Sequence, residues 1–239
     1  MSSISKLFEG MTQIAFPDAC ISCDRLLRDP ALFCEACDAL VIAISNVHCS
    51  RCAEPGLFTN SICPRCAIQP PPFSSTVALF EHEGAVAKAI HRMKYLDRPD
   101  IARSLGQLLG QKLASLPLAR PFFLVPVPIH PMRFRDRKFD QSTLIATEAA
   151  RLCKADVHET WIERTRNTPQ QVGLSEKERE ENVRGAFRAA PQVMGQNIVL
   201  VDDVLTTAAT AREAARVLKE AGAQTVRLAV VARAGRSTH

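Results

Sequence analysis

Hydrophobic and polar residues alternate along residues 74–239 with periods that predict strands and helices in turn. Short apolar runs bounded by proline, glycine or charged residues predict strands. Longer segments with apolar positions three and four residues apart predict helices. Strands that alternate with helices indicate a parallel sheet covered on both faces. The predicted strands are 75–80, 122–127, 157–162, 198–201 and 226–231, and the predicted helices are 84–95, 101–116, 141–154 and 210–220.

Residues 165–184 form a polar excursion that interrupts this pattern. The segment is rich in Asn, Gln, Pro and Gly at first and in charged residues later. A long polar excursion inside a compact domain is often a mobile functional loop. The other interpretation is a solvated helix over 175–182, with Ser175 as its N-cap and Glu178 completing a capping box. The two interpretations are compatible.

Eight of the nine cysteines form four Cys-x-x-Cys pairs in the first third of the chain. A shift of 29 positions superimposes the first two pairs on the last two, so this segment is an internal repeat. Two pairs supply the four thiolates of a closed tetrahedral Zn²⁺ site, which has no open position for catalysis. The predicted ligands of two structural zinc ions are Cys20, Cys23, Cys34, Cys37, Cys49, Cys52, Cys63 and Cys66.

Several features of the cysteine segment leave alternatives open. A redox dithiol does not explain four copies, but an iron–sulfur cluster uses the same ligand set. Successive Cys-x-x-Cys pairs are separated by 10, 11 and 10 residues, so the spacing does not decide which two pairs share a metal ion. Sequential pairing would give two stacked ribbons, and interleaved pairing would give one cross-braced unit. We interpret His48 as structural and Cys153, inside an apolar helical pattern, as a core residue.

Three consecutive prolines at 70–72 predict a boundary between a zinc module over residues 1–73 and a second domain over 74–239. No signal-peptide pattern and no apolar run long enough to cross a bilayer are seen. The sequence therefore predicts a cytoplasmic protein without membrane insertion. Thiols stay reduced in that compartment, which favours metal binding over disulfides.

Charge is distributed unevenly between the two regions. The net charge is +5, yet residues 1–73 contain five Lys/Arg and seven Asp/Glu, so the positive excess lies in residues 74–239. Such an excess is typical of an anion-binding surface or of an ordinary solvated one. Only 5% of residues are aromatic, so platforms for stacking on nucleic-acid bases are few.

Residues 198–210 carry the strongest chemical signal. An apolar run ends in Asp202 and Asp203, a threonine-rich loop follows, and a helix is predicted to begin near Thr210. Ligands bind at the carboxyl ends of parallel strands, and a helix N-terminus attracts phosphate. Carboxylates accept hydrogen bonds from sugar hydroxyls, so the segment suits a sugar phosphate. Direct Mg²⁺ binding and simple surface charge are the alternatives.

The same segment resembles the loop that binds phosphoribosyl diphosphate (PRPP) in type I phosphoribosyltransferases. The whole chain resembles the ComF family, in which a double zinc ribbon precedes a phosphoribosyltransferase domain. Stretches 91–95, 126–141 and 168–187 also match signatures of that family, and the resemblance covers about residues 20–233. It implies a type I phosphoribosyltransferase-like α/β fold, a parallel sheet flanked by helices, behind a small N-terminal four-cysteine zinc-ribbon module.

The resemblance also implies roles for individual residues. Asp202 and Asp203 would hold the ribose 2′- and 3′-hydroxyls, and Gln171 and Arg179 would belong to a hood over the site. Arginine and lysine suit a diphosphate. The 5-phosphate would be held by Thr206, Thr207, Ala208, Ala209 and Thr210, and the pyrophosphate loop would contain Arg133, Arg135, Arg137 and Lys138.

Three positions depart from the family pattern. Ala208 stands where the phosphate loop usually has glycine, and it is strained there if the backbone needs a positive φ. Lys138 replaces a glycine, and Asp140 replaces an asparagine, in the signature that follows the second predicted strand. With these departures, the sequence supports the class of ligand better than it supports full catalytic activity.

Two functions follow from the resemblance. The first is Mg²⁺-dependent transfer of the phosphoribosyl group of PRPP to an unknown acceptor, although no residue stands out as a general base. The second is a non-catalytic PRPP-binding or nucleic-acid-binding protein of natural competence, whose partners would be single-stranded DNA or DNA-uptake proteins. An interaction adaptor built on the zinc module is a third class that no specific feature favours.

Overall fold

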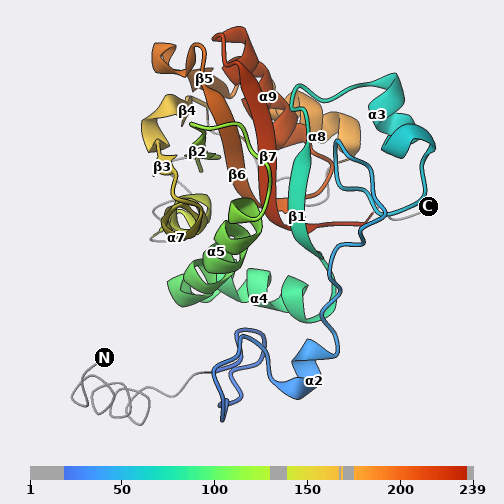
Figure 1. Ribbon diagram of the computed structural model, residues 1–239, viewed down its shortest axis with the longest axis vertical. Coiled ribbons are helices and arrows are strands. Elements are labelled where there is room, and N and C mark those ends of the chain that lie inside the picture. The colour runs from blue at the N-terminus through green and yellow to red at the C-terminus, as the bar shows by residue number, and fades with distance from the viewer. Residues whose placement is uncertain (1–18, 130–138, 167, 169–174, 236–239) are drawn as a thin grey trace.

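A five-stranded parallel sheet forms the centre of the computed structural model, which describes residues 19–129, 139–166, 168 and 175–235 (Figure 1). Its strand order is β1-β7-β6-β2-β3, and every adjacent pair is parallel. The predicted parallel sheet is therefore confirmed. The strands are β1 (Thr76–Glu81), β2 (Phe123–Pro126), β3 (Asp156–Val157), β6 (Asn197–Leu205) and β7 (Thr225–Arg233).

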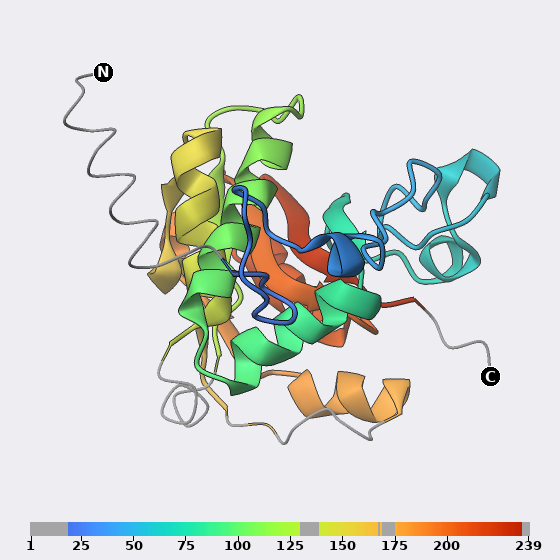
Figure 2. The same cartoon turned by 90° about the horizontal axis from the view of Figure 1, so that it is seen from below.

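Helices α4 (Gly84–Tyr95), α5 (Pro99–Ala114) and α7 (Gln141–Cys153) cover one face of the sheet (Figures 1 and 2). Their apolar stripes pack against alternate strand residues such as Val199 and Val201. This alternation is what a buried strand requires, because successive side chains point to opposite faces. The predicted helix 84–95 coincides with α4.

The opposite face packs against α9 (Ala209–Glu220), with Ile198 and Leu200 of β6 in the same hydrophobic cluster. A small antiparallel sheet of β4 (Ile162–Arg164) and β5 (Phe187–Ala189) extends this cluster. The polar excursion contains the helix α8 (Glu176–Val183), as the capping-box pattern predicts. The 3₁₀ turns Glu159–Trp161 and Pro191–Val193 precede β4 and β6.

One strand prediction is wrong, and another is confirmed but ends too early. The segment 157–162 is not one strand, because β3 ends at Val157 and a 3₁₀ turn redirects the chain into β4. The strand predicted over 198–201 continues through both aspartates to Leu205. It continues because pairing with β7 persists as far as the register Leu205↔Arg233, which outweighs the local signal of two charged residues.

The cysteine segment forms two separate ribbons on opposite faces of the sheet. The first ribbon, residues 19–41 with helix α2 (Glu35–Asp38), shares a hydrophobic cluster with α4 and α5. The second ribbon, residues 47–69 with helix α3 (Pro64–Ile68), lies toward α9, where Arg212 donates to the Gln69 carbonyl oxygen at 3.1 Å. The two ribbons lie apart, so neither the stacked arrangement nor the single cross-braced unit considered above is formed, as Figures 1 and 2 show.

A strap of residues 42–44 joins the two ribbons along the free edge of β1. The Ile44 amide donates to the Leu79 carbonyl at 2.9 Å, and the Glu81 amide donates to the Ile42 carbonyl at 2.8 Å. Pairing of this kind protects a sheet edge from other chains. The boundary after residue 73 stays a prediction, since the ribbons share hydrophobic clusters with the sheet.

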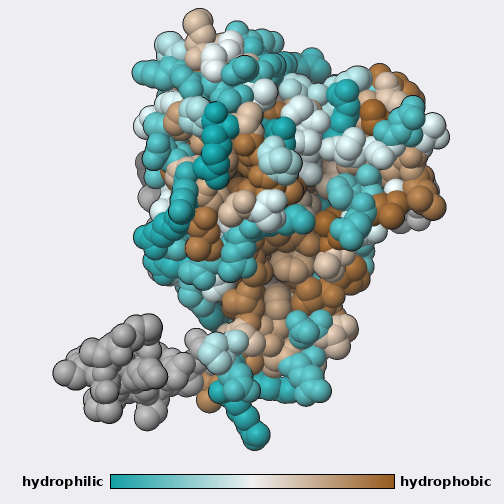
Figure 3. Space-filling model, in the orientation of Figure 1, coloured by the Kyte–Doolittle hydropathy of each residue, from teal (hydrophilic) through white to brown (hydrophobic). Residues whose placement is uncertain are grey.

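Hydrophobic side chains remain exposed along this side of the molecule. They gather toward the strap and the second ribbon in Figure 3, and exposed Leu40, Ile42, Val47 and Leu57 lie in or next to these segments.

In the part of the chain that the structure describes, no helix has both the length and the apolar character needed to cross a bilayer.

Candidate functional site

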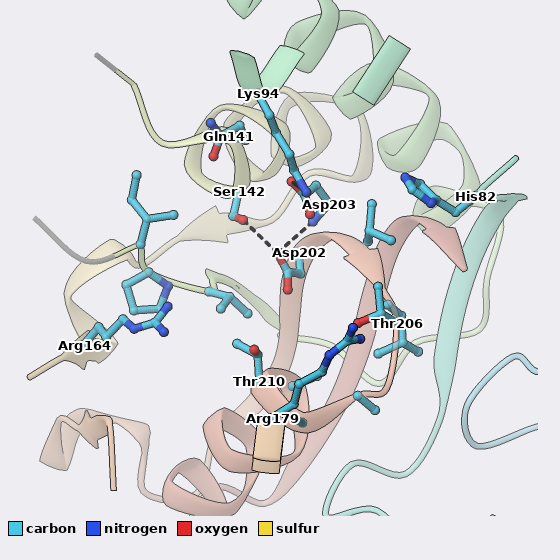
Figure 4. A pocket seen from close by; sticks show the side chains of 18 of the residues that line it. His82, Lys94, Gln141, Ser142, Arg164, Arg179, Asp202, Asp203, Thr206 and Thr210 are labelled. Atoms are coloured by element: carbon cyan, nitrogen blue, oxygen red, sulfur yellow. Dashed lines mark hydrogen bonds and ion pairs between the residues drawn. The ribbon is translucent and has the colours of Figure 1, made fainter. Parts of the chain in front are cut away.

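A cavity of about 310 Å³ opens at the carboxyl ends of β2 and β6 (Figure 4). The carboxyl half of β6 and the first turn of α9 form its floor, and residues 127–129 after β2 form one wall. The other walls come from the ends of α4 and β4, the start of α7, and α8. This is the edge of a parallel sheet at which ligands bind.

Asp202 and Asp203 are held by groups from three elements. Ser142 at the start of α7 donates to Asp202 Oδ1 at 3.1 Å, and the Asp203 amide donates to the same oxygen at 2.9 Å. Lys94 near the end of α4 forms an ion pair with Asp203 Oδ2 at 2.8 Å. Figure 4 shows both side chains pointing toward the aspartates. The pair is thus partly neutralised before any ligand arrives.

The Asp202 carboxyl has an altered acidity. Burial, and next the negative charge of Asp203, raise the pKa of Asp202 to about 7, although Lys94 and the hydrogen bonds to Asp202 oppose the shift. At neutral pH this carboxyl therefore holds a proton for part of the time. A ligand that donates hydroxyl hydrogen bonds to Asp202 favours the ionised form, because only that form accepts with both oxygens.

The β6–α9 loop, residues 206–208, leads from the aspartates into α9. Ala208 has φ 69° and ψ 4°, a left-handed conformation, and it caps α9 without any side-chain hydrogen bond. The Thr207 hydroxyl is buried and has no hydrogen-bond partner among the described residues. The first turn of α9 thus presents backbone N–H groups and a threonine hydroxyl that suit an anion.

Two arginines face this loop from other elements. Arg164 ends β4 and Arg179 lies on α8, and both line the cavity. The Arg179 Nε is buried and has no hydrogen-bond partner in the described part of the chain. Together with Lys94 they bring three basic side chains to the cavity, from β4, α8 and α4, which suits a ligand with more than one anionic group.

The eight predicted zinc ligands form two clusters, each with four Sγ atoms within 4.8 Å of one another. Pairing is sequential, so Cys20, Cys23, Cys34 and Cys37 form one cluster and Cys49, Cys52, Cys63 and Cys66 form the other. The Cys23–Cys34 and Cys52–Cys63 sulfur atoms are both 3.7 Å apart. Four thiolates at about 2.3 Å from a tetrahedral zinc require nearly this separation.

Backbone amides favour the thiolate form at one position in each cluster. Burial alone would raise the thiol pKa, but hydrogen bonds from backbone amides lower the pKa of Cys20 to about 6 and of Cys49 to about 7. Thiolate is the form that binds metal. His48 lies outside both clusters, and its Nδ1 contacts the Ser45 carbonyl oxygen at 2.6 Å, in keeping with a structural role.

Two known domain families match separate segments of the chain. Residues 146–239 match the phosphoribosyl transferase domain, and residues 11–67 match the double zinc ribbon domain. DNA utilization protein YhgH of Escherichia coli O157:H7 is 33% identical over 186 residues, which cover 75% of this chain and 81% of that protein. Competence protein F of Haemophilus influenzae is 26% identical over 194 residues, which cover 78% of this chain and 85% of that protein. The chain belongs to the ComF family.

The family assignment bears on the fold and on the metal. A double zinc ribbon followed by a phosphoribosyltransferase domain is the organisation that the ComF resemblance implies, and the zinc-ribbon match favours zinc over an iron–sulfur cluster. Among solved structures, a Bacillus subtilis glutamine PRPP amidotransferase aligns with 58% of this chain and 30% of its own, at 24% identity and a TM-score of 0.40. A likeness of that extent carries no argument about the site.

Most of the residues that the ComF resemblance singles out can be located. Asp202, Asp203, Thr206 and Arg179 line one cavity, as do Ala208, Ala209 and Thr210, and Thr207 lies in the loop between them. Five others lie outside the described residues. These are Arg133, Arg135, Arg137 and Lys138 of the proposed pyrophosphate loop and Gln171 of the proposed hood.

The contacts of Asp140 explain why aspartate can stand where the family pattern has asparagine. Its carboxylate accepts hydrogen bonds from the Thr143 amide at 3.1 Å and the Ile129 amide at 3.2 Å. The first bond caps α7, and the second fixes the point where the chain leaves the cavity wall. Both need only an acceptor, so aspartate serves at a position where the family has asparagine.

Sequence reasoning missed Lys94, Ser142, Arg164 and His82 as members of the site. Lys94 lies in the 91–95 stretch that matches the family, yet its contact with Asp203 joins residues far apart in the chain. Burial, and then the positive charge of Lys94, lower the pKa of His82, so its imidazole is neutral at neutral pH. No sequence signal distinguishes Arg164 from any other basic residue at a strand end.

The chain should contain two Zn²⁺ ions when it is purified, one in each cluster. Replacing Cys23 by serine removes one ligand and should reduce the metal content to one ion per chain, measured by elemental analysis of the folded protein. Cys153→Ser is the control, because Cys153 is buried outside both clusters, and this variant should retain two ions. Unchanged zinc in the Cys23→Ser protein would contradict the ligand assignment.

Ala208→Gly should stabilise the protein by roughly 1 kcal/mol, since a left-handed conformation costs an L-residue about that much and costs glycine little. Ala221→Gly, at the other end of α9 with φ −79°, is the matched control and should lower the stability. Denaturant unfolding of both variants measures the difference. A destabilised Ala208→Gly protein would show that this backbone is not strained.

Proposed function

We propose that the cavity binds PRPP together with Mg²⁺ and that this ComF protein transfers the phosphoribosyl group to an acceptor that is still unknown. One observation supports the proposal most directly. Two adjacent carboxylates, Asp202 and Asp203, face the same cavity as the uncapped N-terminus of α9. Acceptors for sugar hydroxyls and donors for a phosphate thus lie at the two ends of one short segment.

Asp202 and Asp203 would bind the ribose. Their carboxylates would accept hydrogen bonds from the 2′- and 3′-hydroxyls. Lys94 pairs with Asp203 at 2.8 Å, and it would limit the repulsion between the carboxylates and an anionic ligand. Ser142 keeps the Asp202 carboxyl oriented.

The β6–α9 loop and the first turn of α9 would bind the 5-phosphate. Thr206, Thr207 and Thr210 would donate hydroxyl hydrogen bonds, and backbone amides around Ala208 and Ala209 would donate the rest. The buried Thr207 hydroxyl, which has no hydrogen-bond partner among the described residues, would gain one. A buried polar group without a partner is costly, so this contact would favour the bound state.

In the transfer, the bond from C1′ to the diphosphate breaks and a bond from the acceptor to C1′ forms. Positive charge builds up on the sugar while negative charge builds up on the diphosphate. Mg²⁺ bound with PRPP would supply neutralising charge for the diphosphate. We assign the diphosphate to the basic residues of the segment that follows Ile129 and precedes α7 in the sequence, because Ile129 and the start of α7 both line the cavity. These residues are Arg133, Arg135, Arg137 and Lys138. Gln171 and Arg179 would exclude water as a hood.

The names of the relatives favour a second function. Related proteins are called DNA utilization protein YhgH and competence protein F, so a role in DNA uptake without catalysis is the alternative. PRPP would then act as a bound effector of a cytoplasmic protein that contacts single-stranded DNA or an uptake protein. Both functions require the same binding pocket, and they differ in whether any acceptor causes release of diphosphate.

Calorimetric titration of PRPP, with and without Mg²⁺, tests the shared pocket. The wild-type chain should bind, and the Asp202→Ala/Asp203→Ala protein should lose at least tenfold in affinity, because the ribose hydroxyls lose their acceptors. The control Asp156→Ala/Glu159→Ala also removes two carboxylates, but exposed ones outside the cavity, and it should bind normally. Retained affinity in the first variant would refute the assigned site. Binding without diphosphate release from any nucleobase or amine would favour the alternative function.

The affinity for Mg²⁺–PRPP should rise with pH between pH 6 and 7 and level off above pH 8. The reason is that the pKa of Asp202 is raised to about 7 in the free protein, while the bound ligand favours the ionised carboxylate, so binding releases a proton. The slope is at most tenfold in affinity per pH unit for one released proton. Titration in buffers of different ionisation enthalpy counts the proton directly. Asp202→Asn should abolish the release, and equal proton release by that variant would contradict the assignment.

A further inference from the structure

Arg233, the last residue of β7, links the second ribbon to the β6–α9 loop. Its Nε donates to the Cys52 carbonyl oxygen at 3.1 Å. Its Nη1 donates to the carbonyl oxygens of Leu205 at 3.1 Å and Thr206 at 2.8 Å, and Nη2 pairs with Glu54. One guanidinium therefore holds a residue of a zinc cluster, the last residue of β6 and the first residue of the loop in a fixed arrangement.

The surroundings of Arg233 make this arrangement difficult to replace. Only 3% of the residue is exposed, so its charge depends on Glu54 and on the surrounding carbonyls. Losing one partner of a buried ion pair is strongly unfavourable. The planar guanidinium also donates in several fixed directions at once, which a lysine cannot do. Ribbon and loop are therefore held by one rigid group rather than by independent contacts.

The loop carbonyls determine where the loop amides point. In a trans peptide the carbonyl of one residue and the N–H of the next point in opposite directions. Because the Leu205 and Thr206 carbonyls point toward Arg233, the N–H groups of Thr206 and Thr207 point away from it. These amides belong to the segment that we assign to the 5-phosphate. Arg233 thus orients the donors without contacting the ligand.

The second ribbon also reaches α8, which forms another wall of the cavity. Arg65, next to the zinc ligand Cys66 on α3, pairs with Glu180 of α8 at 3.3 Å. Glu180 adjoins Arg179, which lines the cavity. The ribbon is therefore linked to two elements that line the pocket, to α8 directly and to the β6–α9 loop through Arg233.

We propose that the second zinc ribbon is a structural part of the phosphate-binding site and that Arg233 is the positioning residue that couples them. Loss of zinc from the second cluster, or loss of the Arg233 guanidinium, releases the β6–α9 loop and weakens binding of a phosphate-bearing ligand. This inference rests on the proposed function for the identity of the ligand, but its effect on the loop is independent of any ligand.

Hydrogen exchange of the full-length zinc-loaded chain, without ligand, tests the coupling. Arg233→Met should accelerate exchange of the amides in residues 204–208 by at least tenfold while the chain keeps two zinc ions. Arg120→Met is the matched control, because Arg120 also donates to two backbone carbonyls, those of Cys153 and Lys154, away from the cavity. It should leave exchange in 204–208 unchanged. Unchanged exchange in zinc-loaded Arg233→Met would overturn the inference.

A second pair of variants tests the role of the metal cluster and serves if Arg233→Met does not fold. Cys66→Ser removes a ligand of the second cluster and should accelerate exchange in residues 204–208 at least tenfold. Cys37→Ser removes the corresponding ligand of the first cluster and should have a much smaller effect there. Equal effects of the two variants would contradict a specific role of the second ribbon.

PRPP titration of the same proteins separates this inference from the proposed function. If wild type binds Mg²⁺–PRPP, Arg233→Met should bind at least tenfold more weakly, and Arg120→Met should bind like wild type. If wild type does not bind while Arg233→Met still loosens the loop, the coupling stands and the proposed ligand is wrong. Wild-type affinity in zinc-loaded Arg233→Met would show that Arg233 does not position the site.

Discussion

Mutual repulsion of two neighbouring carboxylates at the end of a buried strand is the interaction on which the architecture of the pocket depends. Asp202 and Asp203 are consecutive in the chain, and their negative charges are offset by the Ser142 hydroxyl of α7 and the Lys94 ammonium group of α4. Burial, and next the remaining repulsion from Asp203, raise the pKa of Asp202. The pocket is thus prepared for a ligand that donates hydrogen bonds to carboxylates, and α4 and α7 must stay fixed relative to β6.

The zinc ribbons supply part of that rigidity from opposite faces of the sheet. In the first ribbon, Asp24 pairs with Arg92 of α4 and, at 2.6 Å, with Arg98 just before α5. In the second, Arg233 joins Cys52 to the β6–α9 loop. A closed four-cysteine site does no chemistry of its own. Its contribution to a binding site is therefore to fix the elements that carry the functional groups.

Local sequence signals predicted the features that depend on neighbours in the chain. Cys-x-x-Cys spacing identified all eight cluster residues, helical periodicity located α4, and Ser175 with Glu178 forms the predicted capping box. The apolar run before Asp202 is part of a strand, as predicted, and the Asp-Asp-x-x-Thr-Thr segment lines a cavity. In each case the determining contacts are formed within a few residues or by one recurring spacing.

Features that depend on distant partners could not be predicted. The strand β6 passes through Asp202 and Asp203 because β7 pairs with it to the end, although two acidic residues locally signal termination. The strap at 42–44 pairs with β1 across a distance in sequence that periodicity does not span. Arg233 would be taken for an exposed charge at the end of a strand, and only its three-dimensional partners identify it as buried.

A crystal structure of the chain with PRPP and Mg²⁺ tests the central claim most directly. The account predicts the ribose hydroxyls on Asp202 and Asp203 and the 5-phosphate on the amides of the β6–α9 loop and the first turn of α9. Arg233 should still hold the Leu205 and Thr206 carbonyls in that complex. A ligand bound elsewhere, or a 5-phosphate that does not contact this loop, would contradict the account.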